Sequence, residues 1–120
     1  MEFPEDLRYS TEHEWVRVDD GTARVGITDY AQDALGDVVF VDVPDEGLEA
    51  IAGASVCEVE STKAVSEIYA PISGVITSVN PALEDTPELL NSDPFGEGWI
   101  FEMSPSDAAA VEALLDVAAY

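Results

Sequence analysis

At 120 residues, the chain is long enough for one domain with a single buried core. It carries 26 acidic and 4 basic residues, and the resulting net charge of −22 argues against nucleic acids and anionic membranes as partners, because binding them needs Lys and Arg. Since 47% of the residues are hydrophobic, this charge does not indicate disorder. We therefore expect one soluble domain over residues 1–120, and a monomer.

The acidic surface has several possible uses. Asp19-Asp20-Gly21 and Asp45-Glu46-Gly47 lack the ligand spacing of an EF-hand loop, so calcium binding is disfavoured. Adaptation to concentrated salt fits better, since the Debye length shrinks to about 3 Å at about 1 M salt and self-repulsion then costs little. The rival interpretation is a mesophilic protein with one acidic patch for a partner, and the even spacing of the acids disfavours it.

Three features that the sequence lacks indicate the cellular compartment of the protein. Cys57 is the single cysteine, so the chain cannot form an internal disulfide, and a reducing compartment is expected. The first residues, MEFPEDLRYS, lack the apolar segment of a signal peptide. No apolar run approaches the roughly 18 residues of a membrane span. We expect a cytoplasmic protein.

The amino-terminal half predicts a hairpin, a short helix and a strand. Apolar and polar residues alternate over 15–18 and 23–27, on either side of a turn at Asp19-Asp20-Gly21. Thr28 stands at an N-cap position before a helix over 29–35 that Gly36 ends. The run DVVFVDV, residues 37–43, predicts a strand that ends at Pro44.

The carboxyl-terminal half predicts further short strands and one helix. Strands are expected over 55–60, 65–70, 74–79 and 99–103, and a loop with a turn of helix near 87–90 over 83–93. A terminal helix is expected with Ser104 as N-cap and Pro105 at its first position, with an apolar stripe formed by Val111, Leu114, Leu115 and Ala118. About seven strands indicate a mainly β fold, a β-sandwich or flattened barrel with helical additions.

Residues for conventional catalysis are scarce. His13 is the single histidine, so a site with several imidazoles is impossible, and Cys57 has no second cysteine with which to share a zinc ion. Acidic neighbours would raise the pKa of the Cys57 thiol, which favours a structural role. No phosphate-binding loop is present. The sequence therefore predicts a protein that is not an enzyme.

Lys63 is the single lysine of the chain, in the stretch VESTKAV between two predicted strands. A lysine at a turn is ordinarily a solvated side chain, but this composition avoids lysine everywhere else. Arginine, present three times, would serve an electrostatic purpose. Lysine differs in having a primary amine that can be acylated, which also removes its charge. We infer a covalently attached group on a hairpin tip.

The residues around Lys63 resemble the lipoyl-lysine hairpin of lipoyl domains, in ESTKA followed by APISG at residues 70–74. Biotinyl domains share the fold, but their lysine usually lies between methionines, whereas here its neighbours are Thr62 and Ala64. The resemblance therefore favours lipoate on Lys63 over biotin. It implies a lipoyl-domain-like flattened β-barrel or sandwich (hybrid hammerhead) with short helices and a C-terminal helix.

Further segments make the resemblance more specific. YSTEHEWV at residues 9–16, VGITDYAQDALGDVVFV at 25–41 and NSDPFGEGW at 91–99 resemble the H protein of the glycine cleavage system. The similarity runs from about residue 8 to the predicted terminal helix. Simple lipoyl domains of 2-oxoacid dehydrogenases lack the HEW segment and the terminal helix.

That resemblance implies a carrier rather than a catalyst. In this family a pyridoxal-phosphate-dependent glycine decarboxylase passes an aminomethyl group to the lipoyl disulfide, and a tetrahydrofolate-dependent aminomethyltransferase removes it. A flavin-dependent dihydrolipoamide dehydrogenase then reoxidises the dithiol, using NAD. A lipoate-attaching enzyme is a further implied partner. The cofactor holds the chemistry and the protein supplies attachment and orientation.

The resemblance also implies a surface cleft that shelters the labile aminomethyl intermediate. Glu14, Glu12 and Glu67 match positions at or near that cleft, where carboxylates could pair with a protonated amine. Glu12 replaces the small hydroxyl residue expected there. His13 and Trp15 are interpreted as packing residues of the first strand.

Two alternatives stay open beside the carrier. One is an H-like protein that mainly relays lipoyl groups to other acceptors. The other is an unmodified acidic interaction domain whose lysine is incidental.

Overall fold

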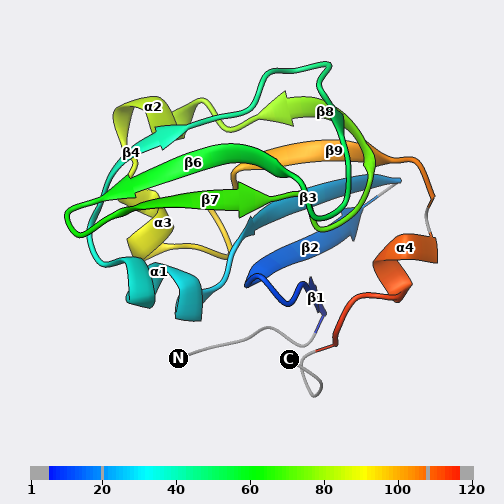
Figure 1. The fold of residues 1–120 in the computed structure, drawn as a ribbon, viewed down its shortest axis with the longest axis horizontal. Coiled ribbons are helices and arrows are strands. Elements are labelled where there is room, and N and C mark those ends of the chain that lie inside the picture. The colour runs from blue at the N-terminus through cyan, green and yellow to red at the C-terminus, as the bar shows by residue number, and fades with distance from the viewer. Residues whose placement is uncertain (1–5, 20, 108, 117–120) are drawn as a thin grey trace.

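The computed structural model describes residues 6–19, 21–107 and 109–116. Across these ranges the fold is mainly β, with two antiparallel sheets and short helices, as predicted (Figure 1). The larger sheet has the order β1-β2-β3-β9-β8-β5 and the smaller one β4-β6-β7. The molecule is flattened, with extents of 37 × 33 × 22 Å.

The first elements follow the predicted pattern closely. Strands β2 (Glu14–Asp19) and β3 (Thr22–Ile27) form the predicted hairpin. Helix α1 (Asp29–Leu35) begins at Thr28, whose Oγ1 accepts a hydrogen bond from the Ala31 N–H at 3.2 Å. It ends at Gly36, whose φ of +80° is a left-handed conformation that favours glycine.

The three strands of the smaller sheet were also predicted. They are β4 (Val38–Asp42), β6 (Ser55–Ser61) and β7 (Val65–Tyr69), of which β6 and β7 form a hairpin with Glu60 opposite Val65. Strand β8 (Gly74–Val79) has the predicted bounds. Two strands of two residues each, β1 (Arg8–Tyr9) and β5 (Glu49–Ala50), were not predicted, because two residues cannot display an alternating pattern.

The predicted start of the terminal helix, at Ser104 and Pro105, is wrong. Ser104 and Pro105 lie at the end of β9 (Phe101–Pro105), where they pair with Val75 and Gly74 of β8. A helix-capping signal was thus overridden by sheet pairing, and Pro105 is tolerated because it ends the strand. The helix found nearby, α4 (Ala109–Glu112), is one turn, and Ala118 lies outside the described residues.

The segment 83–93, predicted as a loop with a turn of helix near 87–90, contains that turn and most of a second one-turn helix. The two helices are α2 (Ala82–Asp85) and α3 (Leu89–Ser92), and α3 overlaps the predicted turn near 87–90. Leu83 and Leu90 are fully buried in the core. Burial of these leucines stabilises turns that the prolines and acids of the segment disfavour.

The main core lies between the two sheets, and a smaller cluster forms around Trp15. Trp15 is fully buried, packs with Leu7 and Tyr9, and donates a hydrogen bond from Nε1 to the Pro94 carbonyl at 2.9 Å. Its ring covers Gly26, where a β-carbon would come within 2.7 Å of the indole. The tryptophan is therefore a packing residue, as predicted.

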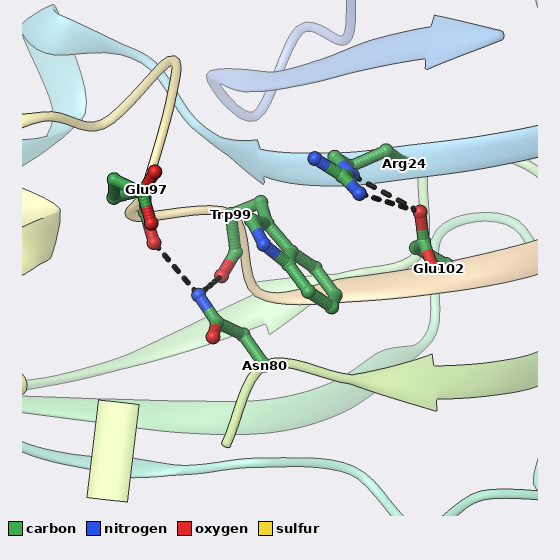
Figure 2. A network of polar contacts seen from close by, with 5 residues as sticks. All are labelled: Arg24, Asn80, Glu97, Trp99 and Glu102. Atoms are coloured by element: carbon green, nitrogen blue, oxygen red, sulfur yellow. Dashed lines mark hydrogen bonds and ion pairs between the residues drawn. The ribbon is translucent and has the colours of Figure 1, made fainter. Parts of the chain in front are cut away.

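A polar network holds the loop that closes this cluster (Figure 2). The Asn80 Nδ2 donates to the carbonyls of Glu97 and Trp99, at 2.7 and 2.8 Å. Arg24 stacks over the Trp99 ring, 4.6 Å from its centroid, and forms an ion pair with Glu102 at 3.0 Å. These contacts fix the loop between α3 and β9 against the larger sheet.

Candidate functional site

Lys63 is exposed at the tip of the β6–β7 hairpin. Ser61 shapes the tip: its Oγ accepts from the N–H groups of Lys63 and Ala64, both at 3.2 Å, and its N–H donates to the Ala64 carbonyl at 2.8 Å. The Thr62 N–H donates to the Asp37 carbonyl at 3.0 Å, which ties the tip to the segment after α1. A rigid turn thus presents the single amine of the lysine to solvent.

A cleft of about 350 Å³ lies between α1 and β7, and we call it the α1–β7 cleft. Its walls combine aliphatic side chains with carboxylates. It is lined by Glu12, His13, Ile27, Tyr30, Ala31, Ala34, Leu35, Ser66, Glu67, Ile68 and Tyr69. Glu12 and Glu67, both predicted at a cleft, therefore lie here, and both are exposed.

Glu14 lines a neighbouring hollow of about 230 Å³, the Glu14 pocket, which adjoins the α1–β7 cleft at Glu12 and Tyr69. The pocket is closed on its other side by residues 113–115, near the chain end. The three glutamates predicted at a cleft are thus brought together around one tyrosine.

Tyr69 connects two of these carboxylates. Its hydroxyl donates to Glu67 Oε2 at 3.1 Å, and its backbone N–H donates to Glu14 Oε2 at 3.4 Å. The hydrogen bond to Glu67 raises the pKa of the Tyr69 hydroxyl. Sequence reasoning missed this tyrosine, although its place two residues after Glu67 on one strand puts both on the same face.

Glu14 is 2% exposed, and burial raises the pKa of its carboxyl group from 4.5 to about 7. Ser10 opposes this shift, because its hydroxyl donates to Glu14 Oε1 at 2.5 Å, and the Tyr69 N–H opposes it too. Glu14 can therefore hold or release a proton near neutral pH. Ser10 carried no sequence signal of its own.

His13 lies in the turn before β2 rather than in a strand, which corrects the expectation. Its φ is +69°, an unusual value for a residue other than glycine, and its ring lies 4.6 Å from that of Tyr30. Its packing role is nevertheless consistent with this contact. Cys57 is buried, and burial with nearby Asp42 raises its pKa to about 12, as the acidic context predicted.

Comparison with known proteins agrees with this geometry. The family model described as glycine cleavage H-protein matches residues 7–120. The chain belongs to this family. It is 58% identical over 124 residues to a glycine cleavage system H protein of Mycobacterium avium, with 99% of this chain and 94% of the relative covered.

Two further relatives extend the comparison. A protein of Haloarcula marismortui with the same name, qualified as probable, is 56% identical over 120 residues, covering 100% of this chain and 94% of the relative. The crystal structure of a glycine cleavage system H protein from Mycobacterium marinum superposes with a TM-score of 0.89 at 44% identity, covering 97% of this chain and 94% of the other. The predicted family and fold are confirmed.

Two other observations concern the described part of the chain. Within it, no helix is long and apolar enough to cross a membrane. The same residues contain no group of three or more His, Cys, Asp or Glu side chains arranged to hold a metal ion.

Proposed function

We propose that Lys63 carries a lipoyl group in amide linkage and that the chain is a carrier of the glycine cleavage system. The single observation that carries this proposal is the presentation of the one lysine, exposed on a rigid hairpin tip beside a cleft. Membership of the glycine cleavage H-protein family supports it, as do relatives that bear the name glycine cleavage system H protein.

The residues present fit such a group. The Lys63 amine is accessible to a lipoate-attaching enzyme, and its hairpin is held by the Ser61 turn. When bound, lipoate supplies a disulfide that can be reduced and a thiol that can accept an aminomethyl group. Ile27, Leu35 and Ile68 give the α1–β7 cleft an apolar wall suited to an aliphatic chain.

The glutamates supply the polar part of the proposed site. Glu12 and Glu67 in the α1–β7 cleft offer carboxylates to a protonated amine, and such charge-assisted hydrogen bonds are among the stronger ones. Glu14, with a pKa of about 7, is placed to exchange a proton with an amine near neutral pH. The protein then binds and shelters a cargo, while partner enzymes perform the chemistry.

The proposed partners follow from this role. Glycine decarboxylase would load the aminomethyl group, aminomethyltransferase would remove it, and dihydrolipoamide dehydrogenase would reoxidise the dithiol. We place the chain in the cytoplasm as a monomer. A cell with a salty interior is proposed because a protein with a net charge of −22 is favoured by concentrated salt. The Haloarcula relative is consistent with that setting.

Mass spectrometry of the protein from its native cell, or after incubation with a lipoate ligase, tests the attachment. We expect a lipoyl adduct on the peptide that contains Lys63, and its absence under both conditions would refute the carrier role. The unmodified interaction domain is the alternative that such an absence would favour.

Reconstitution tests the transfer. Lys63→Arg keeps the charge and should fold normally, but it should support no glycine decarboxylation when mixed with the partner enzymes. Full activity of this variant would place the arm elsewhere. If the lipoylated wild type instead passes lipoyl groups to other acceptors and supports no glycine cleavage, the relay role is the correct one.

A further inference from the structure

The side chain of Lys63 rests on a glycine. A β-carbon added to Gly36 would lie 3.2 Å from Lys63 Cε and 3.6 Å from Cδ, closer than or at ordinary van der Waals contact. Gly36 has a φ of +80°, which other residues adopt at a cost. The absence of a side chain here therefore makes room for the stem of the lysine.

The residues beneath the lysine form a support that we call the Gly36 shelf, residues 36–38. The shelf connects α1 to β4, and its Asp37 carbonyl accepts the hydrogen bond from the Thr62 N–H described above. In addition, Val38 pairs with Ser61 across β4 and β6. The shelf is thus joined to the hairpin tip at Ser61 and Thr62, the two residues that precede Lys63.

Asn91, in α3, holds the shelf through both the oxygen and the nitrogen of its side-chain amide. Its Oδ1 accepts from the Val38 N–H at 2.8 Å, and its Nδ2 donates to the Gly36 carbonyl at 2.8 Å. The same Nδ2 donates to Gln32 Oε1, in α1, at 3.0 Å. One side chain therefore ties α1, the shelf and α3 together.

The chemistry of these three bonds calls for an amide. The shelf presents one N–H and one carbonyl to Asn91, and Gln32 presents a second oxygen. An aspartate would still accept from the Val38 N–H, but the oxygen in place of Nδ2 would face the Gly36 carbonyl and Gln32 Oε1 without a proton between them. An alanine would leave the shelf carbonyl and N–H without these partners.

We propose that Asn91 is a positioning residue that holds the Gly36 shelf so that the stem of Lys63 leaves the hairpin in one direction, along the carboxyl end of α1. Gly36 directly follows Leu35, which lines the α1–β7 cleft, so this direction leads a group on Nζ to that cleft. The inference rests on the proposed function of Lys63 as the attachment point, but the orientation of the unmodified lysine can be tested separately.

The first test uses the unmodified protein. As Lys63 is the single lysine, its side-chain protons give one set of NMR signals, and a nuclear Overhauser effect to the Gly36 α-protons reports the stem on the shelf. We expect this effect in the wild type and its loss in Asn91→Asp. In Gly36→Ala, we expect no effect to the one α-proton that residue 36 keeps. If it persists in both folded variants, the shelf does not position the lysine.

Gly21→Ala is the matched control for Gly36→Ala. Both glycines have a φ of +80°, so both substitutions place an alanine at a positive φ, but a β-carbon on Gly21 would meet nothing within 4 Å. The control should retain the Lys63–Gly36 effect. Should Asn91→Asp fail to fold, Asn91→Ala, which removes all three hydrogen bonds of the amide, takes its place.

The second test uses protein lipoylated in vitro, with the loaded fraction measured by mass spectrometry. After reduction, iodoacetamide should alkylate the arm thiols several-fold faster in Asn91→Asp and Gly36→Ala than in the wild type and in Gly21→Ala. Equal rates in all four proteins would overturn the direction proposed for the arm. A wild type that takes up no lipoyl group would refute the proposed function, whereas the NMR result would still decide the role of the shelf.

Discussion

Replacing Glu14 by glutamine should change how the stability of the protein depends on pH. In the folded state burial raises the pKa of Glu14 from 4.5 to about 7, so the folded protein binds this proton more tightly than the unfolded chain. The associated stability is fully present below about pH 4.5, and it is lost as the pH rises to about 7. Glutamine resembles the protonated acid in shape and has no charge to desolvate.

The magnitude follows from the interval between the two pKa values. At about 1.4 kcal/mol per pH unit, the interval from 4.5 to about 7 corresponds to about 3.5 kcal/mol in the free energy of unfolding. Relative to Glu14→Gln, the wild type should therefore lose about 2 to 3 kcal/mol between about pH 5 and pH 8. Other carboxyl groups contribute equally to both proteins, so they cancel in the difference.

Urea unfolding at constant salt, followed by tryptophan fluorescence, measures this difference, because Trp15 is fully buried in the folded state. A carboxyl ¹³C NMR titration of Glu14 provides an independent value. A difference that stays constant with pH, or that grows in favour of the wild type, would refute the buried carboxyl group as its source. Ser10→Ala should raise the pKa of Glu14 further, because the serine hydroxyl donates to the carboxylate.

Gly26→Ala should lower the free energy of unfolding by about 1–3 kcal/mol, because the alanine β-carbon would come within 2.7 Å of the Trp15 ring. Urea titration measures the loss, and an unchanged midpoint would contradict this packing. Asn80→Ala should lower it by about 2–3 kcal/mol, since two carbonyls lose their donor in a buried site, and a loss below about 0.5 kcal/mol would show that water replaces the amide. The Cys57 thiol, buried with a pKa of about 12, should resist iodoacetamide in the folded protein at about pH 8 and react on unfolding in urea. Finally, transfer from about 2 M to about 0.05 M salt should lower the unfolding midpoint, because the net charge of −22 is then poorly screened; equal midpoints would argue against salt adaptation.

Local signals predicted those elements whose ends are marked by their own residues. Helix α1 begins at Thr28 and ends at Gly36 as the capping pattern indicated, and β8 has its predicted bounds. The same kind of signal failed at Ser104, since a capping serine followed by proline is also acceptable at the end of a strand. Only pairing with β8, which no local pattern encodes, decides between the two.

For the site, a similar division holds. The single lysine, its turn and the motifs around it are properties of the sequence, and they were enough to indicate an acylatable amine and the family. The sequence did not indicate the proposed role of Asn91. The residues to which it is hydrogen-bonded lie 53 to 59 positions away and meet it only after α3 packs beside α1.

The sequence by itself determined which groups are available: one lysine amine, one thiol, and carboxylates at many positions. Tertiary structure decided which of these carboxylates differ from the rest. Glu12, Glu14 and Glu67 share one type of side chain, yet Glu14 alone of the three is buried, so desolvation raises its pKa, while the other two stay exposed at the α1–β7 cleft. Desolvation depends on the neighbours that folding brings together, and it therefore cannot be read from a list of residues.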